Sequence, residues 1–142
     1  CNSWRPRIMA NGTIAFDTLQ TSDSANTGTS KTLDTSYIFN GVSKAWVNLK
    51  GVDTFAIRDS FNLTSATDNG TGDYTLTIAN DMGNTTYSSP CSAGNTSSGR
   101  YNIISESDGK ATGTADFFGF QTNTGGALDP DEMSTSLLGD LA

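Results

Sequence analysis

The chain has 142 residues and a formal net charge of −7, and only 35% of its residues are apolar. The length fits one domain, or a small domain with an arm. The acidic charge and only 8 basic residues argue against a nucleic-acid partner, because phosphate contacts require clusters of Lys and Arg. No apolar run approaches the ~20 residues of a membrane-spanning helix, so we expect no membrane insertion. The low apolar content predicts either an extended arm or a core shared between identical copies.

The N-terminal part of the chain is polar and weakly patterned. Residues 13–19 and 37–39 predict two short strands, and the Ser- and Thr-rich residues 20–36 predict an exposed connector. We therefore assign residues 1–36 to an N-terminal strand, arm and polar connector. Residues 1–8 precede a Met followed by a small residue, and we expect them to lie upstream of the natural start.

Three runs in the middle of the chain alternate apolar and polar residues with a period of two, which is typical of half-buried strands. They are residues 44–50, 54–63 and 74–79. Asp59 falls on the apolar face of the second run. The apolar residues predicted to face a core are Ala45, Val47 and Leu49 in the first run, Phe55, Ile57, Phe61 and Leu63 in the second, and Tyr74, Leu76 and Ile78 in the third.

A hairpin turn precedes the third run. Its turn residues are Asp68, Asn69, Gly70, Gly72 and Asp73. Asn-Gly is a strong hairpin signal because both residues tolerate positive φ. The three runs and this turn together predict an antiparallel β-meander.

Further strands are predicted after the meander. Residues 84–93 predict an edge strand, because Pro90 has no N–H to donate within a central one. Two more strands, joined by an Asp-Gly turn, are predicted at residues 100–106 and 111–121. Residues 37–122 are therefore predicted to form an antiparallel β-domain.

The C-terminal stretch, residues 123–142, predicts a Gly-rich hinge and a short helix. Asp129 is a candidate N-cap and Pro130 a candidate first helical residue, and acidic residues fill the first turn. The apolar residues that then fall near one helical face are Met133, Leu137, Leu138 and Leu141. The fold class predicted for the whole chain is all-β, an antiparallel β-sandwich or meander with an extended N-terminal arm and this C-terminal helix.

Candidate catalytic groups are few. The chain has no His, which closes the ordinary Ser–His and Cys–His routes. A glycosidase needs only two carboxylates, and the candidates are Asp53, Asp59, Asp68 and Asp73. Turn geometry or ion pairing explains each of them, and the turn from Asp68 to Asp73 lacks the acid spacing of a calcium loop. We therefore predict no enzyme, no catalytic residue, no bound cation and no cofactor.

The two cysteines, Cys1 and Cys91, do not indicate a metal site, because a zinc or iron centre needs more ligands than these. A disulfide between them would tie a chain terminus to a loop, so we favour two free thiols. An alternative interpretation of the N-terminus is a lipoprotein whose mature first residue is Cys1.

Trp46 points away from the face shared by Ala45, Val47 and Leu49, so it needs a second surface. Two interpretations stay open. We favour an interface between subunits, which would bury the indole ring. The alternative is an exposed aromatic platform for a sugar.

Segments of this central stretch resemble a domain of tailed-bacteriophage fibre proteins that is common in marine phages. They are residues 45–48 (AWVN), 56–62 (AIRDSFN) and 67–74 (TDNGTGDY). Residues 9–19 are also similar to the start of short fibre-like proteins in such phages. The similarity covers about residues 9–19 and 37–82 and does not extend to residues 83–142.

The resemblance implies a virion structural protein located in the phage particle, a homotrimer along a fibre axis. Its expected partners are other virion proteins of the tail or capsid and a glycan or receptor on the host surface. The resemblance implies no catalytic residue in this chain. We therefore interpret the motif residues as scaffold and interface: Trp46, Val47, Phe55, Ile57, Phe61 and Tyr74. Receptor contacts are expected around residues 87–100 and from residue 123 onward.

Two alternative functions share these sequence features. The first is a capsid decoration protein that stabilises the head lattice. The second is a small carbohydrate-binding or carbohydrate-active domain.

Overall fold

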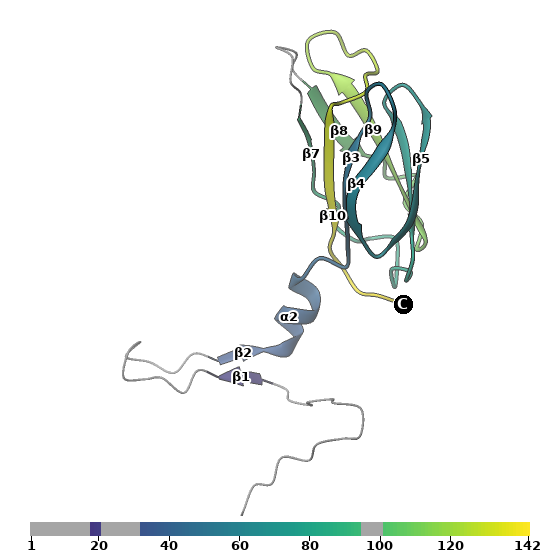
Figure 1. Ribbon diagram of the computed structural model, residues 1–142. Coiled ribbons are helices and arrows are strands. Elements are labelled where there is room, and N and C mark those ends of the chain that lie inside the picture. Colours follow the sequence, from purple (N-terminus) through teal and green to yellow (C-terminus); the bar gives the residue numbers. More distant parts are fainter. Residues whose placement is uncertain (1–17, 21–31, 95–100) are drawn as a thin grey trace, which may run out of the picture. The chain divides into compact units, whose positions relative to one another are not determined.

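The computed structural model describes residues 18–20, 32–94 and 101–142 (Figure 1). The chain divides into two compact units, Cys1–Phe39 and Asn40–Ala142.

In the first unit, β1 (Thr18–Gln20) pairs antiparallel with β2 (Thr32–Asp34). Helix α2 (Thr35–Gly41) follows directly, and its last two residues belong to the second unit. The strand predicted at residues 37–39 is therefore wrong, because these residues are helical. Asp34 explains the helix start, since its Oδ1 accepts a hydrogen bond from the backbone N–H of Ser36 at 2.8 Å, as an N-cap does. The same hydrogen bond lowers the pKa of Asp34. Residues 13–17 of the predicted first strand lie outside the described residues.

The second unit is a sandwich of two four-stranded antiparallel sheets, which confirms the all-β prediction (Figure 1). The first sheet has the strand order β4-β3-β10-β7 and the second β5-β6-β9-β8. The strands of the first sheet are β3 (Ala45–Lys50), β4 (Ala56–Phe61), β7 (Cys91–Gly94) and β10 (Glu132–Leu137). Those of the second sheet are β5 (Leu63–Gly70), β6 (Asp73–Ile78), β8 (Tyr101–Ser105) and β9 (Thr114–Gln121).

The core lies between the two sheets and is built from alternate residues of the central strands. The first sheet contributes Ala45, Val47 and Leu49 from β3 and Met133 and Leu137 from β10. The second sheet contributes Tyr74, Leu76 and Ile78 from β6, Ile103 from β8 and Ala115 and Phe117 from β9. The inward faces predicted for residues 44–50 and 74–79 are thus confirmed.

The face predicted for residues 54–63 is only half right. Phe55 and Leu63 pack against the core, but Ile57 is 38% and Phe61 55% exposed. The reason is that β4 is an edge strand whose register with β3 shifts at a bulge. Phe61 pairs with the outward-facing Trp46, whereas Ile57, on the other side of the bulge, pairs with the inward-facing Leu49.

The predicted three-run meander is wrong, because β4 and β5 belong to different sheets. The chain passes between the sheets at Asn62, which has a φ of 56°. Its side-chain amide donates hydrogen bonds to the carbonyl oxygens of Lys44 at 3.0 Å and Asn80 at 3.1 Å, and its Oδ1 accepts one from the N–H of Asn80 at 2.9 Å. Residues 44–78 therefore form two hairpins, one in each sheet.

The hairpin between β5 and β6 is confirmed, but its turn is Thr71-Gly72, because Asn69 and Gly70 belong to β5, whose register with β6 shifts between Asp68 and Gly70. Asp68 Oδ1 accepts a hydrogen bond from the N–H of Gly70 at 3.0 Å, and Asn69 donates to Asp73 Oδ1 at 3.2 Å. Gly72 has a φ of 76°, and a Cβ there would overlap the carbonyl oxygen of Gly119. Only glycine fits this position without strain.

The predicted C-terminal helix is also wrong. Residues 132–137 form strand β10, which lies between β3 and β7 in the centre of the first sheet. Asp129 caps no helix. Its Oδ1 instead accepts hydrogen bonds from the N–H of Gly72 at 2.7 Å and the hydroxyl of Tyr74 at 2.9 Å, which ties the loop before β10 to the second sheet. The predicted Gly-rich hinge forms the loop between β9 and β10.

Candidate binding groove on the outer face of the first sheet

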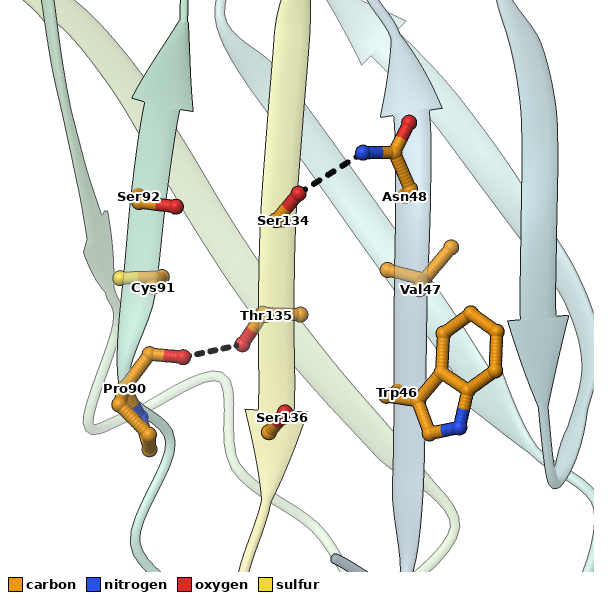
Figure 2. A pocket seen from close by; sticks show the side chains of 9 residues that line it. All are labelled: Trp46, Val47, Asn48, Pro90, Cys91, Ser92, Ser134, Thr135 and Ser136. Atoms are coloured by element: carbon orange, nitrogen blue, oxygen red, sulfur yellow. Dashed lines mark hydrogen bonds between the residues drawn. The ribbon is translucent and has the colours of Figure 1, made fainter.

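A groove of about 380 Å³ lies on the outer face of the first sheet, over β10 and its two neighbours (Figure 2). We call it the Trp46 groove. The residues that line it are Trp46, Val47, Asn48, Pro90, Cys91, Ser92, Ser134, Thr135 and Ser136. Three strands that are far apart in the sequence thus meet at one surface.

The pairing register places the polar side chains of the groove in rows. Ser136 lies opposite Trp46, and Ser134 lies opposite both Asn48 on β3 and Ser92 on β7. All five side chains leave the outer face, because the alternate residues of β3 and β10 fill the core. Figure 2 shows the two serines of β10 between Trp46 and Asn48 on one side and Ser92 and Pro90 on the other. Small hydroxyl side chains therefore form the floor.

One end of the groove is fixed by a polar network. Asn48 donates a hydrogen bond to Ser134 Oγ at 2.9 Å. Arg58 reaches from β4 across β3 and donates to Glu132 at 3.2 Å and to the carbonyl oxygen of Asp131 at 2.7 Å. The Arg58–Glu132 ion pair is solvent-exposed on both sides, so it adds little stability but leaves each charge with an opposite partner.

Three polar groups of the groove are available to a ligand. The indole N–H of Trp46 and the hydroxyl groups of Ser92 and Ser136 have no hydrogen-bond partner in the part of the chain that the structure describes. Hydroxyl groups both donate and accept, whereas an indole N–H only donates. The groove can therefore bind a ligand that carries both donors and acceptors.

The back of the groove is closed by groups that point into the sandwich. Thr135 donates a hydrogen bond from Oγ1 to the carbonyl oxygen of Pro90 at 3.0 Å (Figure 2). Cys91 is a free thiol whose Sγ lies 3.3 Å from the carbonyl oxygen of Ile103. Burial raises the pKa of this thiol, which favours its protonated form. Cys1, the other cysteine, lies outside the described residues.

Two buried tyrosines of the core, Tyr74 and Tyr87, have a raised pKa. Burial is the largest cause for Tyr74, and its hydrogen bond to Asp129 adds to the effect. Burial also raises the pKa of Tyr87, whose hydroxyl donates to the carbonyl oxygens of Ala111 and Thr114. Both phenols therefore stay neutral and act as structural hydrogen-bond donors.

The four carboxylates considered as catalytic candidates take local roles. Asp53 pairs with Lys50 at 3.2 Å, and Asp59 accepts a hydrogen bond from the N–H of Ser60 at 2.8 Å. Asp68 and Asp73 hold the β5–β6 turn, as described above. Within the described ranges, no cluster of three or more His, Cys, Asp or Glu residues is placed to hold a metal ion.

The predicted scaffold residues separate into three groups in the structure. Trp46 lines the groove, with Val47 behind it in the core. Phe55 stacks on Tyr74 with ring centroids 5.9 Å apart. Ile57 and Phe61 are exposed on β4. The serines of β10 were missed because residues 132–137 were assigned to a helix, although Met133, Thr135 and Leu137 alternate with them at the period of a strand.

No protein-family model, curated protein or solved structure matches this chain. Among the described residues, the structure contains no helix long and apolar enough to cross a membrane.

Proposed function

We propose that this chain is a structural protein of a bacteriophage virion, a fibre or spike component that contributes to host-cell attachment. The observation that carries the proposal is where the phage-like segments lie in the fold. Residues 45–48 belong to β3, residues 56–62 to β4 and the crossing at Asn62, and residues 67–74 to the β5–β6 hairpin. They contribute to both sheets, so the resemblance concerns the frame of the sandwich and not a peripheral loop.

The flank of the sandwich formed by β4 and β5 supports an oligomer. Both are edge strands, and both are largely exposed. Ile57 and Phe61 add exposed apolar side chains to this flank. An edge strand with exposed apolar residues invites pairing with another chain unless a partner covers it. A homotrimer, as the resemblance implies, would supply that partner from identical copies.

The Trp46 groove supports an attachment role over a purely lattice-stabilising one. Recognition sites often lie on rigid scaffolds that keep the binding groups in place. Here the side chains stand on three hydrogen-bonded strands, so their spacing is set by the sheet itself. A groove of this kind would serve a protein that contacts a host surface.

Imaging of the parent particle tests the proposal. We expect cryo-electron microscopy, with a gold-labelled antibody against this chain, to place it on a tail fibre or spike. Density on the head lattice would support the capsid decoration alternative instead. Absence of the chain from purified particles would overturn the virion assignment.

A hydrolysis assay tests the carbohydrate-active alternative. The full chain is incubated with neutral polysaccharides, and newly formed reducing ends are measured. We expect none. Cleavage that is lost in Asp59→Asn, Asp68→Asn or Asp73→Asn would assign an enzymatic function instead.

A further inference from the structure

We propose that the Trp46 groove binds a neutral pyranose unit of a glycan. The inference rests on the function proposed above for the source of the glycan, which is then the host cell surface. The binding chemistry itself follows from the residues of the groove.

The aromatic wall fits one face of a sugar ring. Trp46 is partly exposed on the outer face, and its indole has an electron-rich π-face and an N–H at its edge. A pyranose ring presents C–H groups on one face and hydroxyl groups around its rim. The C–H groups can pack on the indole while the rim hydroxyls remain available for hydrogen bonds.

The floor of the groove matches the hydroxyl groups of a sugar. Ser92 and Ser136 carry hydroxyls that have no partner among the described residues, and Asn48 and Ser134 add a further amide and hydroxyl. Sugar hydroxyls donate and accept hydrogen bonds, as serine hydroxyls do. A purely apolar ligand would leave these groups unpaired, which costs binding free energy.

The charge of the groove selects a neutral ligand. None of its nine lining residues carries a formal charge. Of the charged side chains beside it, Arg58 and Glu132 are 3.2 Å apart and neutralise each other, and the carboxylate Asp59 lies opposite Asn48 on β4. An anionic sugar would find no unpaired cation among the lining residues. The volume of about 380 Å³ lies at the small end of the ~300–1,000 Å³ of ligand pockets, which suits a small unit of a glycan.

A second copy of the chain is a less suitable occupant of this groove. Serine is depleted in protein–protein interfaces, and a close-packed interface would bury the groove's hydroxyls without partners. The exposed apolar residues Ile57 and Phe61 lie on β4, and neither of them lines the groove, although Phe61 lies opposite Trp46 in the register. We therefore assign contact between copies to the β4 flank and the groove to the glycan.

Tryptophan fluorescence of the full chain tests the inference. The chain has two tryptophans, so Trp4→Phe leaves Trp46 as the only emitter. The probes are the methyl pyranosides of glucose, galactose, mannose and N-acetylglucosamine, with methyl glucuronide as the anionic comparison. We expect a saturable change in Trp46 emission with at least one neutral probe and none with the glucuronide. Equal binding of the glucuronide would overturn the assignment to neutral sugars.

Variants locate the binding in the groove. Calorimetric titration with the best probe should show affinity at least about ten-fold weaker for Trp46→Ala, which removes the wall, and for Ser136→Tyr, which fills the floor. Tyr37→Ala is the matched control, because Tyr37 is an aromatic residue of α2 that is 71% exposed and outside the groove. Its affinity should be unchanged, and circular dichroism confirms that each variant folds.

The outcomes separate this inference from the proposed function. If no neutral probe binds the full chain, or if Trp46→Ala binds as well as the parent, the groove is not a sugar site, even when the chain is found on a fibre. If the sugar binds but the chain is missing from particles, the virion assignment fails while the sugar site stands.

Discussion

Asn62 lies where the chain leaves β4 in one sheet and enters β5 in the other, with a φ of 56°. Its side chain holds the backbone of Lys44 and Asn80 through three hydrogen bonds of 2.9–3.1 Å. Asn tolerates this left-handed conformation better than other non-glycine residues. One residue thus combines the turn between the sheets with the hydrogen bonds that fix it.

Substitution of Asn62 separates these two roles. Asn62→Gly keeps the conformation but removes the hydrogen bonds, whereas Asn62→Ala removes the bonds and adds the cost of a left-handed residue. We expect both variants to be less stable than the parent, and Asn62→Ala to be about 1 kcal/mol less stable than Asn62→Gly. Urea denaturation measures the difference. Equal stability of both variants and the parent would show that the crossing does not depend on this side chain.

Tyr74 predicts a specific dependence of stability on alkaline pH. Its pKa is raised in the folded state, so the unfolded chain loses the phenol proton first, near pH 10. The stability from the neutral phenol is therefore complete below pH 10. It is lost as pH rises further, by up to about 1.4 kcal/mol per pH unit.

The variant Tyr74→Phe tests this dependence. At pH 7 we expect it to be less stable, because the hydrogen bond to Asp129 is gone. Between pH 10 and 11.5 its free energy of unfolding should fall less steeply with pH than that of the parent. If the free energy of unfolding fell equally steeply with pH in the parent and the variant, Tyr74 would have the same pKa in the folded and the unfolded state. Tyr87 contributes equally to both proteins and cancels in the comparison.

Strand β10 shows how tertiary context decides between two local patterns. Asp129, Pro130 and the acids that follow form a good helix start. In the same segment every second side chain, at Met133, Thr135 and Leu137, points into the core. The neighbouring strands β3 and β7 can supply hydrogen-bond partners for its backbone N–H and C=O groups on both sides. Burial of these residues between the sheets outweighs the weak local preference for a helix.

A proline substitution tests the central position of β10. Ser136→Pro removes an N–H that donates to the carbonyl oxygen of Pro90 at 3.2 Å and places a ring within a central strand. We expect it to abolish most of the folding stability, as measured by thermal denaturation followed by circular dichroism. Ser136→Ala, the matched control, keeps the N–H and should melt close to the parent. If Ser136→Pro had the same melting temperature as Ser136→Ala, β10 would not be a central strand of the first sheet.

The central strands could be predicted from sequence, and the edge strands only in part. Val47 and Leu76 lie in runs that keep a strict period of two because both neighbours of these strands are sheet strands. Strand β4 breaks the pattern at its bulge, and no glycine or proline marks the crossing at Asn62. The site was half predictable. Trp46 stood out by its outward position, but Ser134 is 86 residues from its partner Asn48, and no local pattern encodes that pairing.

In the second unit, the flank formed by β4 and β5 carries the exposed apolar side chains of Ile57 and Phe61. We expect native mass spectrometry of the full chain to show a trimer at micromolar concentration. The double variant Ile57→Glu, Phe61→Glu should be monomeric but folded, because both side chains are already exposed in the single chain. Ile104→Glu is the matched control, since Ile104 is 44% exposed on β8, the edge strand at the opposite flank. A parent that is strictly monomeric would contradict the trimer.

The central position of β10 also has a consequence for biosynthesis. The first sheet needs β10 between β3 and β7, yet β10 is the last of the described strands to be translated. While the ribosome is still making residues 101–131, β3 and β7 have no common neighbour, and the first sheet cannot close. Such non-local pairing slows folding and leaves apolar strands exposed meanwhile. Nascent chains should therefore need chaperone protection until β10 emerges, and prematurely terminated products should be degraded before they can enter an assembly.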